Sequence, residues 1–241
     1  MPESETILDR ARGALRSEPR LDMHRTPIAL AFADGVMTIE GEVDNVAAKK
    51  LALEHIAALP AVTRVIDRLH VKPAQAMADG QIRDLVRNAL LDEPALADVA
   101  IGELVKGHER AVREPPVDAN GSITIHIENG IVTLDGEVRS YAQKSLAGVL
   151  AWWVPGSRDV VNGLAIDPPE EATDGEITEA VRVALEKDPF VNPSQIRAST
   201  ARRVVTLTGL VPTDAEREMA EYDAWYVFGV DRVTNQIAVR R

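Results

Sequence analysis

Cysteine is absent from this chain of 241 residues, and only 4% of its residues are aromatic. Without cysteine, disulfides, thiolate nucleophiles and cysteine-ligated metals are excluded. No apolar run approaches the roughly 18 residues that would span a bilayer as a helix. Residues 1–19 carry charges throughout and lack the apolar stretch of a secretory signal. We therefore expect a cytoplasmic location, or a periplasmic one if a signal has been removed.

Basic charge is also scarce, because 27 Lys and Arg residues face 38 Asp and Glu residues, for a net charge of −11. A nucleic-acid binder needs basic surface to neutralise phosphates, so we expect no nucleic-acid partner. The same excess argues against purely electrostatic docking on an anionic membrane. It leaves open the insertion of apolar groups and a local basic patch.

Catalytic and metal-binding motifs are missing as well. The five histidines show no metal-ligand spacing, and no phosphate-binding loop, dinucleotide fingerprint or nucleophile elbow occurs. Carboxylates such as Glu40 and Glu42 alternate along a predicted strand, which is typical of a solvated sheet face. The sequence therefore predicts no enzyme, no cofactor and no metal site.

What the chain does contain is one pattern written three times. A strand-like segment with a central glycine recurs as GVMTIEGEV (35–43), GIVTLDGEV (130–138) and RVVTLTGLV (203–211). A second strand-like segment recurs as VIDRLHV (65–71), VVNGLAI (160–166) and VTNQIAV (233–239). Self-similarity at such spacing indicates duplicated structural units. We expect three tandem domains, at residues 1–73, 74–168 and 169–241.

Each copy reads as the order α-β-β-α-β. Ile82, Val86 and Leu90 follow the helical period, whereas the strand-like segments alternate with period two. A second helix, such as residues 45–59, separates the hairpin from the closing strand. The sequence thus predicts an α+β fold of three tandem two-layer sandwiches, each a small three-stranded sheet covered by two helices.

Two segments depart from the common pattern. Asn129-Gly130 suits a tight hairpin, whereas the third copy has Arg202-Arg203 at that place, so we expect a different turn there. The second copy also holds additional residues near 102–121. Their glycine, proline and charge content predicts a surface loop.

The central glycines of the repeat, Gly41, Gly136 and Gly209, are expected to be structural. They share a sheet face with apolar residues such as Ile39. A side chain at these positions would meet a crossing helix, or the strand bends there. We assign them no ligand.

These residues carry a family resemblance. A helix, the G-[IV]-[VM]-T-[LI]-x-G-x-V hairpin strand, a second helix and a V-x-[ND]-x-[LI]-x-[VI] strand resemble the BON domain of the bacterial OsmY and nodulation family. The resemblance implies a non-catalytic α/β sandwich that binds phospholipid or attaches to envelope surfaces. It also implies a role in osmotic or envelope stress, and one cytoplasmic relative of the family binds potassium.

Aromatic pairs are the most specific candidates for a binding site. AWWVPG (151–156) and AWYVFG (224–229) occupy equivalent places in the second and third copies. A helical projection puts Trp152 and Trp225 away from the sheet, with Trp153 and Tyr226 on the flank. Three interpretations stay open: packing within each copy, a contact between copies, or a lipid or protein contact.

We therefore predict a non-enzymatic module that associates with phospholipid or another envelope component during stress. The first alternative is a cytoplasmic sensor of a small ion, such as potassium, or of a small ligand. The second alternative is a protein scaffold, because tandem repeats supply extended surface for a protein partner or for self-association.

Overall fold

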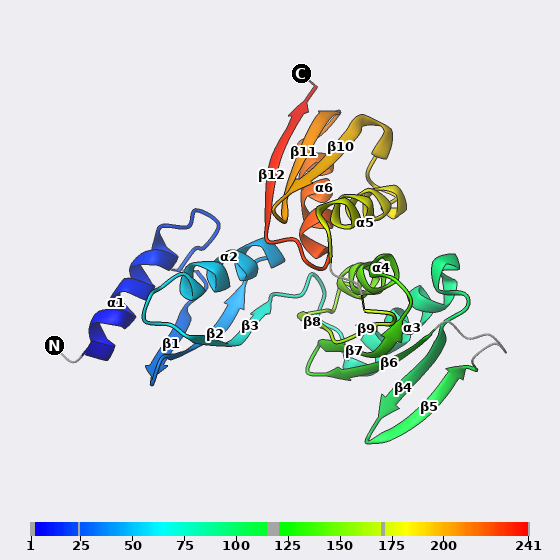
Figure 1. Ribbon diagram of the computed structural model, residues 1–241, viewed down its shortest axis with the longest axis horizontal. Coiled ribbons are helices and arrows are strands. Elements are labelled where there is room, and N and C mark those ends of the chain that lie inside the picture. Colours follow the sequence, from blue (N-terminus) through cyan, green and yellow to red (C-terminus); the bar gives the residue numbers. More distant parts are fainter. Residues whose placement is uncertain (1–2, 24, 115–120, 170–171, 241) are drawn as a thin grey trace. The chain divides into compact units, whose positions relative to one another are not determined.

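The repeated pattern folds three times as a mixed unit of helices and strands (Figure 1). The computed structural model describes residues 3–23, 25–114, 121–169 and 172–240, and within them it has six α-helices and three sheets. The predicted α+β class of repeated two-layer sandwiches is confirmed. The chain divides into two units, residues 1–72 and 73–241, so the second and third copies belong to one unit.

The first copy contains α1 (Glu3–Arg16), β1 (Ile28–Ala33), β2 (Val36–Val43), α2 (Val46–Ala57) and β3 (Arg64–Val71). Strand β1 pairs antiparallel with β2, and β2 pairs parallel with β3. A parallel neighbour requires a crossover, which α2 supplies. Met37, Ile39 and Val43 alternate along β2 and are buried. The period-two pattern therefore gives β2 one face in the core.

The third copy repeats this topology with α5 (Asp174–Lys187), η2 (Pro193–Gln195), β10 (Ile196–Ala201), β11 (Val204–Val211), α6 (Asp214–Tyr226) and β12 (Arg232–Val239). Its sheet order is β10-β11-β12, again with one antiparallel and one parallel pair. Helix α5 begins with a capping box, in which Thr173 and Glu176 satisfy each other's backbone amides. The helix start is thus specified locally.

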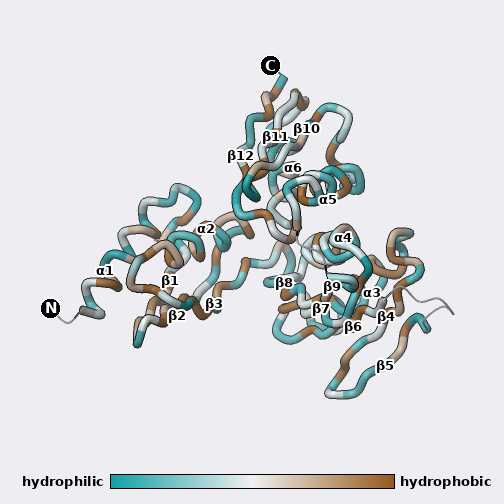
Figure 2. Tube along the Cα trace, viewed as in Figure 1, coloured by the Kyte–Doolittle hydropathy of each residue, from teal (hydrophilic) through white to brown (hydrophobic). Residues whose placement is uncertain are grey.

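The second copy contains α3 (Asp79–Asp92), η1 (Pro94–Leu96), β4 (Ala100–Val105), β5 (His108–Arg113), β6 (Gly121–Glu128), β7 (Ile131–Val138), α4 (Tyr141–Trp152), β8 (Asp159–Asn162) and β9 (Ala165–Ile166). Its sheet has the order β5-β4-β6-β7-β8, with β9 pairing to β7. Hydrophobic residues recur along the helices and strands (Figure 2). Fifteen buried hydrophobic residues, from these elements and their connections, form one cluster in this copy.

The additional segment of the second copy is a β-hairpin and not the predicted surface loop. Strands β4 and β5 pair antiparallel, and β4 pairs parallel with β6, so the hairpin widens the sheet. Glu103 of β4 is 2% exposed and pairs with the guanidinium of Arg87 on α3 at 3.1 Å. At the other end, Arg113 donates to the carbonyl oxygens of Val99 and Leu96. Residues 115–120 of the segment lie outside the described residues.

The three repeated glycines have left-handed backbones, with φ of 151° at Gly41, 124° at Gly136 and 152° at Gly209. A Cβ on Gly41 would lie 2.9 Å from the carbonyl oxygen of Pro27. At the other two glycines it would overlap a backbone oxygen of the adjacent segment. The obstacle is therefore neighbouring backbone, and the crossing helix offered as one explanation is not the cause.

The hairpin turn of the third copy does not differ from the others, contrary to the prediction. Arg202 and Arg203 have φ of 52° and 62°, close to the 53° and 78° of Asn129-Gly130. Asp174, the first residue of α5, accepts hydrogen bonds from both arginine amides, at 2.8 and 2.9 Å. These bonds favour the left-handed turn, which two non-glycine residues adopt at a cost.

The repeated Asn or Asp of the closing strand joins that strand to the second helix. The Asn162 amide donates to the carbonyl oxygen of Lys144 at 2.8 Å, and Asn235 does the same to Arg217 at 3.0 Å. In the first copy, the equivalent Asp67 instead pairs with the buried ammonium of Lys49 at 3.0 Å. The motif therefore serves the fold of each copy.

Candidate binding surfaces

The aromatic residues singled out from the sequence lie at the C-terminal ends of α4 and α6, and three of the four join the second copy to the third. Trp152 stacks on Tyr226, with ring centroids 5.7 Å apart and planes inclined by 13°. Trp153 donates a hydrogen bond from Nε1 to Asp223 Oδ1 at 3.0 Å. The structure thus brings together residues that lie in equivalent segments of two different copies.

Trp225 departs from the helical projection. It is 1% exposed, whereas Trp152 is partly exposed. The two equivalent tryptophans therefore have different surroundings. The projection could not predict this difference, because it considers one helix without its neighbours. The stacking of Trp152 on Tyr226 is a contact between copies, and the burial of Trp225 argues against a lipid or protein contact at that residue.

A second set of contacts extends the join along α4. The Tyr141 hydroxyl donates to the carbonyl oxygen of Phe228, and the ammonium of Lys144 lies 4.1 Å from the centre of the Phe228 ring. A cation over an aromatic face is attractive, more so when it is partly desolvated. Burial lowers the pKa of Lys144. None of these three residues was predicted as a contact, although Phe228 stands within the aligned AWYVFG segment.

Charged groups complete the join. Lys187, the last residue of α5, pairs with both carboxylate oxygens of Glu93 at 2.9 and 2.8 Å, and Glu93 is buried. Asp223 is 1% exposed, and burial followed by the nearby charge of Asp188 raises the pKa of Asp223 to about 8. Sequence reasoning missed both Glu93 and Asp223, since an Asp or Glu that belongs to no motif is usually solvated.

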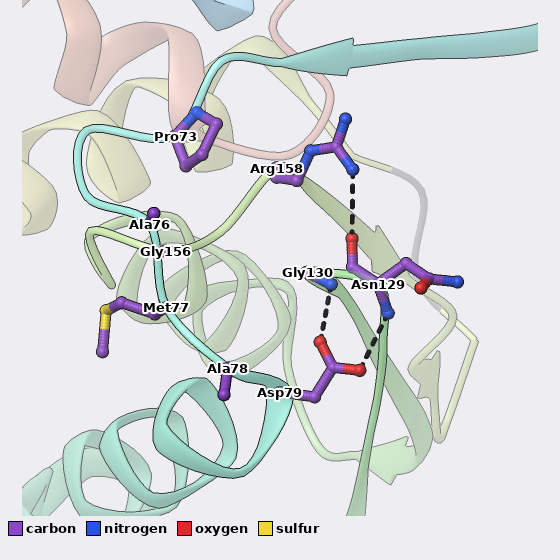
Figure 3. Close-up of a pocket in the computed structure, with 9 residues that line it drawn as sticks. All are labelled: Pro73, Ala76, Met77, Ala78, Asp79, Asn129, Gly130, Gly156 and Arg158. Carbon is purple, nitrogen blue, oxygen red and sulfur yellow. Dashed lines mark hydrogen bonds between the residues drawn. The ribbon is translucent and has the colours of Figure 1, made fainter.

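An open pocket of about 440 Å³ lies elsewhere in the second copy (Figure 3). Asp79, at the start of α3, accepts from the amides of Asn129 and Gly130 at 3.0 and 2.8 Å. Arg158 reaches across to the Asn129 carbonyl oxygen at 3.4 Å. Met77 and the chain before it form the apolar side. The Asp79 carboxylate is already bound by the amides of the hairpin turn, so we assign this pocket a structural role.

The most exposed large apolar side chain in the described part of the chain is Phe190, at 72%. It follows the end of α5, where Asp188 Oδ1 accepts a hydrogen bond from the Phe190 amide at 2.7 Å. This bond fixes the backbone from which the ring projects. Phe190 was not predicted as a contact, because it has no aromatic counterpart in the other copies and belongs to no motif.

No cluster of three or more His, Asp or Glu side chains suited to a metal ion occurs in the described ranges. Among the helices described, none is both long and apolar enough to cross a bilayer.

Each of the three copies matches the same family of protein domains. The BON domain model matches residues 4–73, 109–168 and 173–241, one segment in each copy. The chain belongs to the BON domain family, as its repeats predicted. The second match begins inside β5, so α3 and β4 lie outside it.

Among individual proteins, the chain is similar to Osmotically-inducible protein Y of Escherichia coli (strain K12). The two are 30% identical over 124 residues, which cover 49% of this chain and 62% of the relative. Two solved structures of CdsD, a structural protein of the type III secretion system of Chlamydia trachomatis, match 98% of this chain and 98% or 92% of their own chains. They are 14% and 16% identical to this chain, with TM-scores of 0.26 and 0.25, which are too low to indicate a shared overall fold.

Proposed function

We propose that this protein is a non-catalytic binding module that associates with phospholipid at the cell envelope during osmotic stress. Membership of the BON family and similarity to an osmotically inducible relative support the stress role. They also favour an envelope location. No comparison supports the cytoplasmic location that the sequence led us to expect.

Phe190 carries the proposed contact. Its ring is 72% exposed on a backbone held by Asp188, whereas Trp225 is too buried to reach a partner. Trp152 and Trp153 lie at the contact between the second and third copies and remain partly exposed. We propose them as secondary contacts for a partner that binds beside that contact. Burying one Phe side chain contributes about 1.5–3 kcal/mol, so a single ring supports weak, reversible association.

Charge near Phe190 predicts the lipid preference. Glu216 lies on the same copy, and its carboxylate accepts from the amide of Asn192, two residues beyond Phe190. This carboxylate does not favour an anionic surface. We expect insertion of the ring into zwitterionic vesicles, with no gain from added anionic lipid and little dependence on salt.

The test compares vesicle binding of the wild-type chain with that of Phe190→Ser and Leu210→Ser. Leu210 is a matched control, since it is an apolar side chain 44% exposed on β11. We expect about tenfold or greater weakening for Phe190→Ser, because 1.4 kcal/mol is tenfold, and no change for Leu210→Ser. Equal loss in both variants would indicate non-specific adsorption and overturn the assignment to Phe190.

The two alternatives give different results in parallel measurements. A small-ion sensor would show a melting temperature that rises with potassium and not with sodium. A scaffold would show a stable protein complex or self-association without vesicles. Either result, together with no vesicle binding by the wild type, would replace the lipid proposal.

A further inference from the structure

Charge is divided unevenly between the sheets of the second and third copies. In the third copy, α5 and α6 pack on one side of β10, β11 and β12, and in the second copy α3 and α4 pack on one side of β6, β7 and β8. Alternate side chains of each strand point to the other side, which we call the open face. The two copies meet through α4, α5 and α6, so that join uses neither open face.

The open face of the third copy carries no acid. Strands β10, β11 and β12, all described in full, contain no Asp or Glu, although the whole chain has a net charge of −11. Arg197 and Arg232 are exposed on this face, opposite Thr208 and Val204 respectively. Thr208 and Val204 are four positions apart on β11, so the two arginines lie in rows separated by about 13 Å along the strand. The row between them holds small hydroxyl side chains, those of Ser199, Thr206 and Thr234.

The open face of the second copy has the opposite charge. On β6, β7 and β8 it carries four acids: Asp135 and Glu137 at one end, and Glu128 and Asp159 at the other. The latter two flank Ile131, four positions before Asp135, so the acids also lie in rows about 13 Å apart. The positions of these three strands on the open face, all of them described, include no Lys or Arg. The basic side chain among them is His126, whose Nε2 lies 3.9 Å from Glu128.

The first copy differs from both, because its sheet carries charges of both signs on one face. Glu40 of β2 pairs with Arg68 of β3 at 3.5 Å. A face whose charges are compensated in this way attracts neither a cationic nor an anionic partner strongly. The complementary faces are therefore those of the second and third copies.

We propose that the open face of the third copy binds the open face of the second copy in another molecule of this chain. Within one molecule the two faces cannot meet, because the helices on their opposite sides pack against each other. Two sheets pack face to face about 10 Å apart, with their strands within about 30° of parallel. In that arrangement, Arg197 and Arg232 reach acids at both ends of the partner face, and the small side chains of the middle row allow close approach.

Other anionic partners fit this face less well. The net charge of −11 repels a nucleic acid or an anionic membrane as a whole. Two arginines also fall short of the roughly four to eight basic residues that mark a site for anionic lipid. A second molecule of this chain accounts for the basic face and the acidic face together. This contact does not depend on the proposed lipid binding at Phe190.

The size of the face sets the strength of the contact. Three strands about 4.8 Å apart and eight residues long present roughly 400 Å² to a partner. A standard interface buries about 800 Å² on each side, so this contact is weak and transient. It uses different surfaces on the two molecules, and each molecule keeps one face free for the next. Association should therefore continue beyond the dimer as the concentration rises.

The test measures the mass of the full chain by small-angle scattering, up to a protein concentration of about 1 mM, where a contact of about 4 kcal/mol becomes half occupied. At about 0.1 M salt the Debye length is about 10 Å, which screens the repulsion between whole molecules and leaves contacting pairs attractive. At about 1 M salt the pairs are screened too. We expect the average mass to rise above 26.2 kDa with concentration at the lower salt, and to stay near 26.2 kDa at the higher salt.

Two charge-reversal variants test the faces themselves. Arg197→Glu/Arg232→Glu makes both faces acidic, and Asp135→Arg/Glu137→Arg makes the acidic face basic at one end. All four side chains are exposed, and circular dichroism checks that the variants fold. Each variant alone should remain a monomer, whereas an equimolar mixture of the two should associate again. Arg10→Glu/Arg25→Glu is the control, because it changes the net charge by the same amount at exposed positions of the first copy and should associate like the wild type.

Three results would overturn the proposal. The wild type could keep a mass of 26.2 kDa at every concentration and salt. Both variants could associate as the wild type does, or their mixture could remain monomeric. Binding of a monomeric wild type to phosphatidylglycerol vesicles that is lost in Arg197→Glu/Arg232→Glu would assign the basic face to lipid instead.

Discussion

Trp152 of the second copy stacks on Tyr226 of the third copy, although the aligned partner of Trp152 is Trp225. The contact therefore joins non-equivalent positions of two related domains. The first copy has Ala57 and Ala58 where the second has Trp152 and Trp153. The three copies share one fold, and the residues at these two positions differ between the first copy and the second.

Removal of the stacked pair should weaken this join. Trp152→Ala and Tyr226→Ala each lose buried aromatic surface, and the double variant should lose less than the sum of the two. We expect a coupling free energy of about 0.5–1.5 kcal/mol, as found for aromatic pairs. Urea unfolding followed by circular dichroism measures it, and strictly additive losses would show that the rings do not interact.

Gly209 should tolerate no side chain. Its φ of 152° and the overlap of a Cβ with the carbonyl oxygen of Gln195 predict a loss of about 2–3 kcal/mol for Gly209→Ala. Gly175→Ala is the control, since Gly175 lies in α5 with no atom closer than 3.7 Å to its added Cβ. The control should stabilise by about 0.5–1 kcal/mol. Equal effects in thermal unfolding would contradict the backbone explanation.

Asp79 should stabilise the hairpin turn of the second copy. Asp79→Ala removes the acceptor of both turn amides, at Asn129 and Gly130, with an expected cost of about 1–3 kcal/mol. Amide hydrogen exchange at these two positions should accelerate. Asp79→Asn keeps one acceptor oxygen and should lie between the wild type and the alanine variant, whereas unchanged exchange would show that the turn forms without the carboxylate.

The equivalent Asp174 gives this turn a pH dependence in the third copy. Hydrogen bonds from the amides of Arg203 and Arg202 lower the pKa of Asp174 below its ordinary value of 3.8. Because the folded pKa is depressed, the stabilisation is present above 3.8 and is lost as the pH falls through the lower folded value. The amide chemical shifts of Arg202 and Arg203 should report that titration, and their constancy in acid would argue against the contact.

Asp67→Asn should destabilise the first unit. The variant keeps the acceptor for the Leu69 amide but removes the charge opposite the buried ammonium of Lys49. We expect a loss of about 1–2 kcal/mol in the free energy of unfolding, less than for a fully buried pair because Asp67 is partly exposed.

Asn162→Asp is the reverse change in the second copy. The new carboxylate should draw Lys144 away from the Phe228 ring and weaken the join between copies.

Much of the fold followed from the sequence because it depends on local periodicity. The alternation of Met37, Ile39 and Val43 and the helical spacing of Ile82, Val86 and Leu90 place these residues in the core without reference to distant contacts. Because the three copies align in register, each assignment of a helix or strand in one copy was supported by the other two. The order of elements and the family were therefore predictable.

The inserted hairpin was missed because one of its core positions is occupied by a charge. Glu103 interrupts the apolar alternation of β4, and its burial becomes favourable only with Arg87, which lies on another element. Lys106-Gly107, both with positive φ, was the available signal of a tight turn. A composition argument could not reveal a non-local ion pair.

The binding candidates were predictable only in part. Alignment found Trp152, Trp153, Trp225 and Tyr226, but a projection of one helix could not show that Trp225 is buried or that Trp152 meets Tyr226. The exposure of Phe190 and the burial of Asp223 depend on which surfaces meet after folding. Those surfaces are a property of tertiary packing, which no local pattern records.

The central functional claim is that the intact chain associates with a lipid surface. Flotation of the wild-type protein with phosphatidylcholine vesicles, and with vesicles that also contain phosphatidylglycerol, tests it most directly. The account predicts that the protein floats with the zwitterionic vesicles, and that neither anionic lipid nor salt increases the floating fraction. Protein that stays at the bottom of the gradient with both kinds of vesicle would contradict the account.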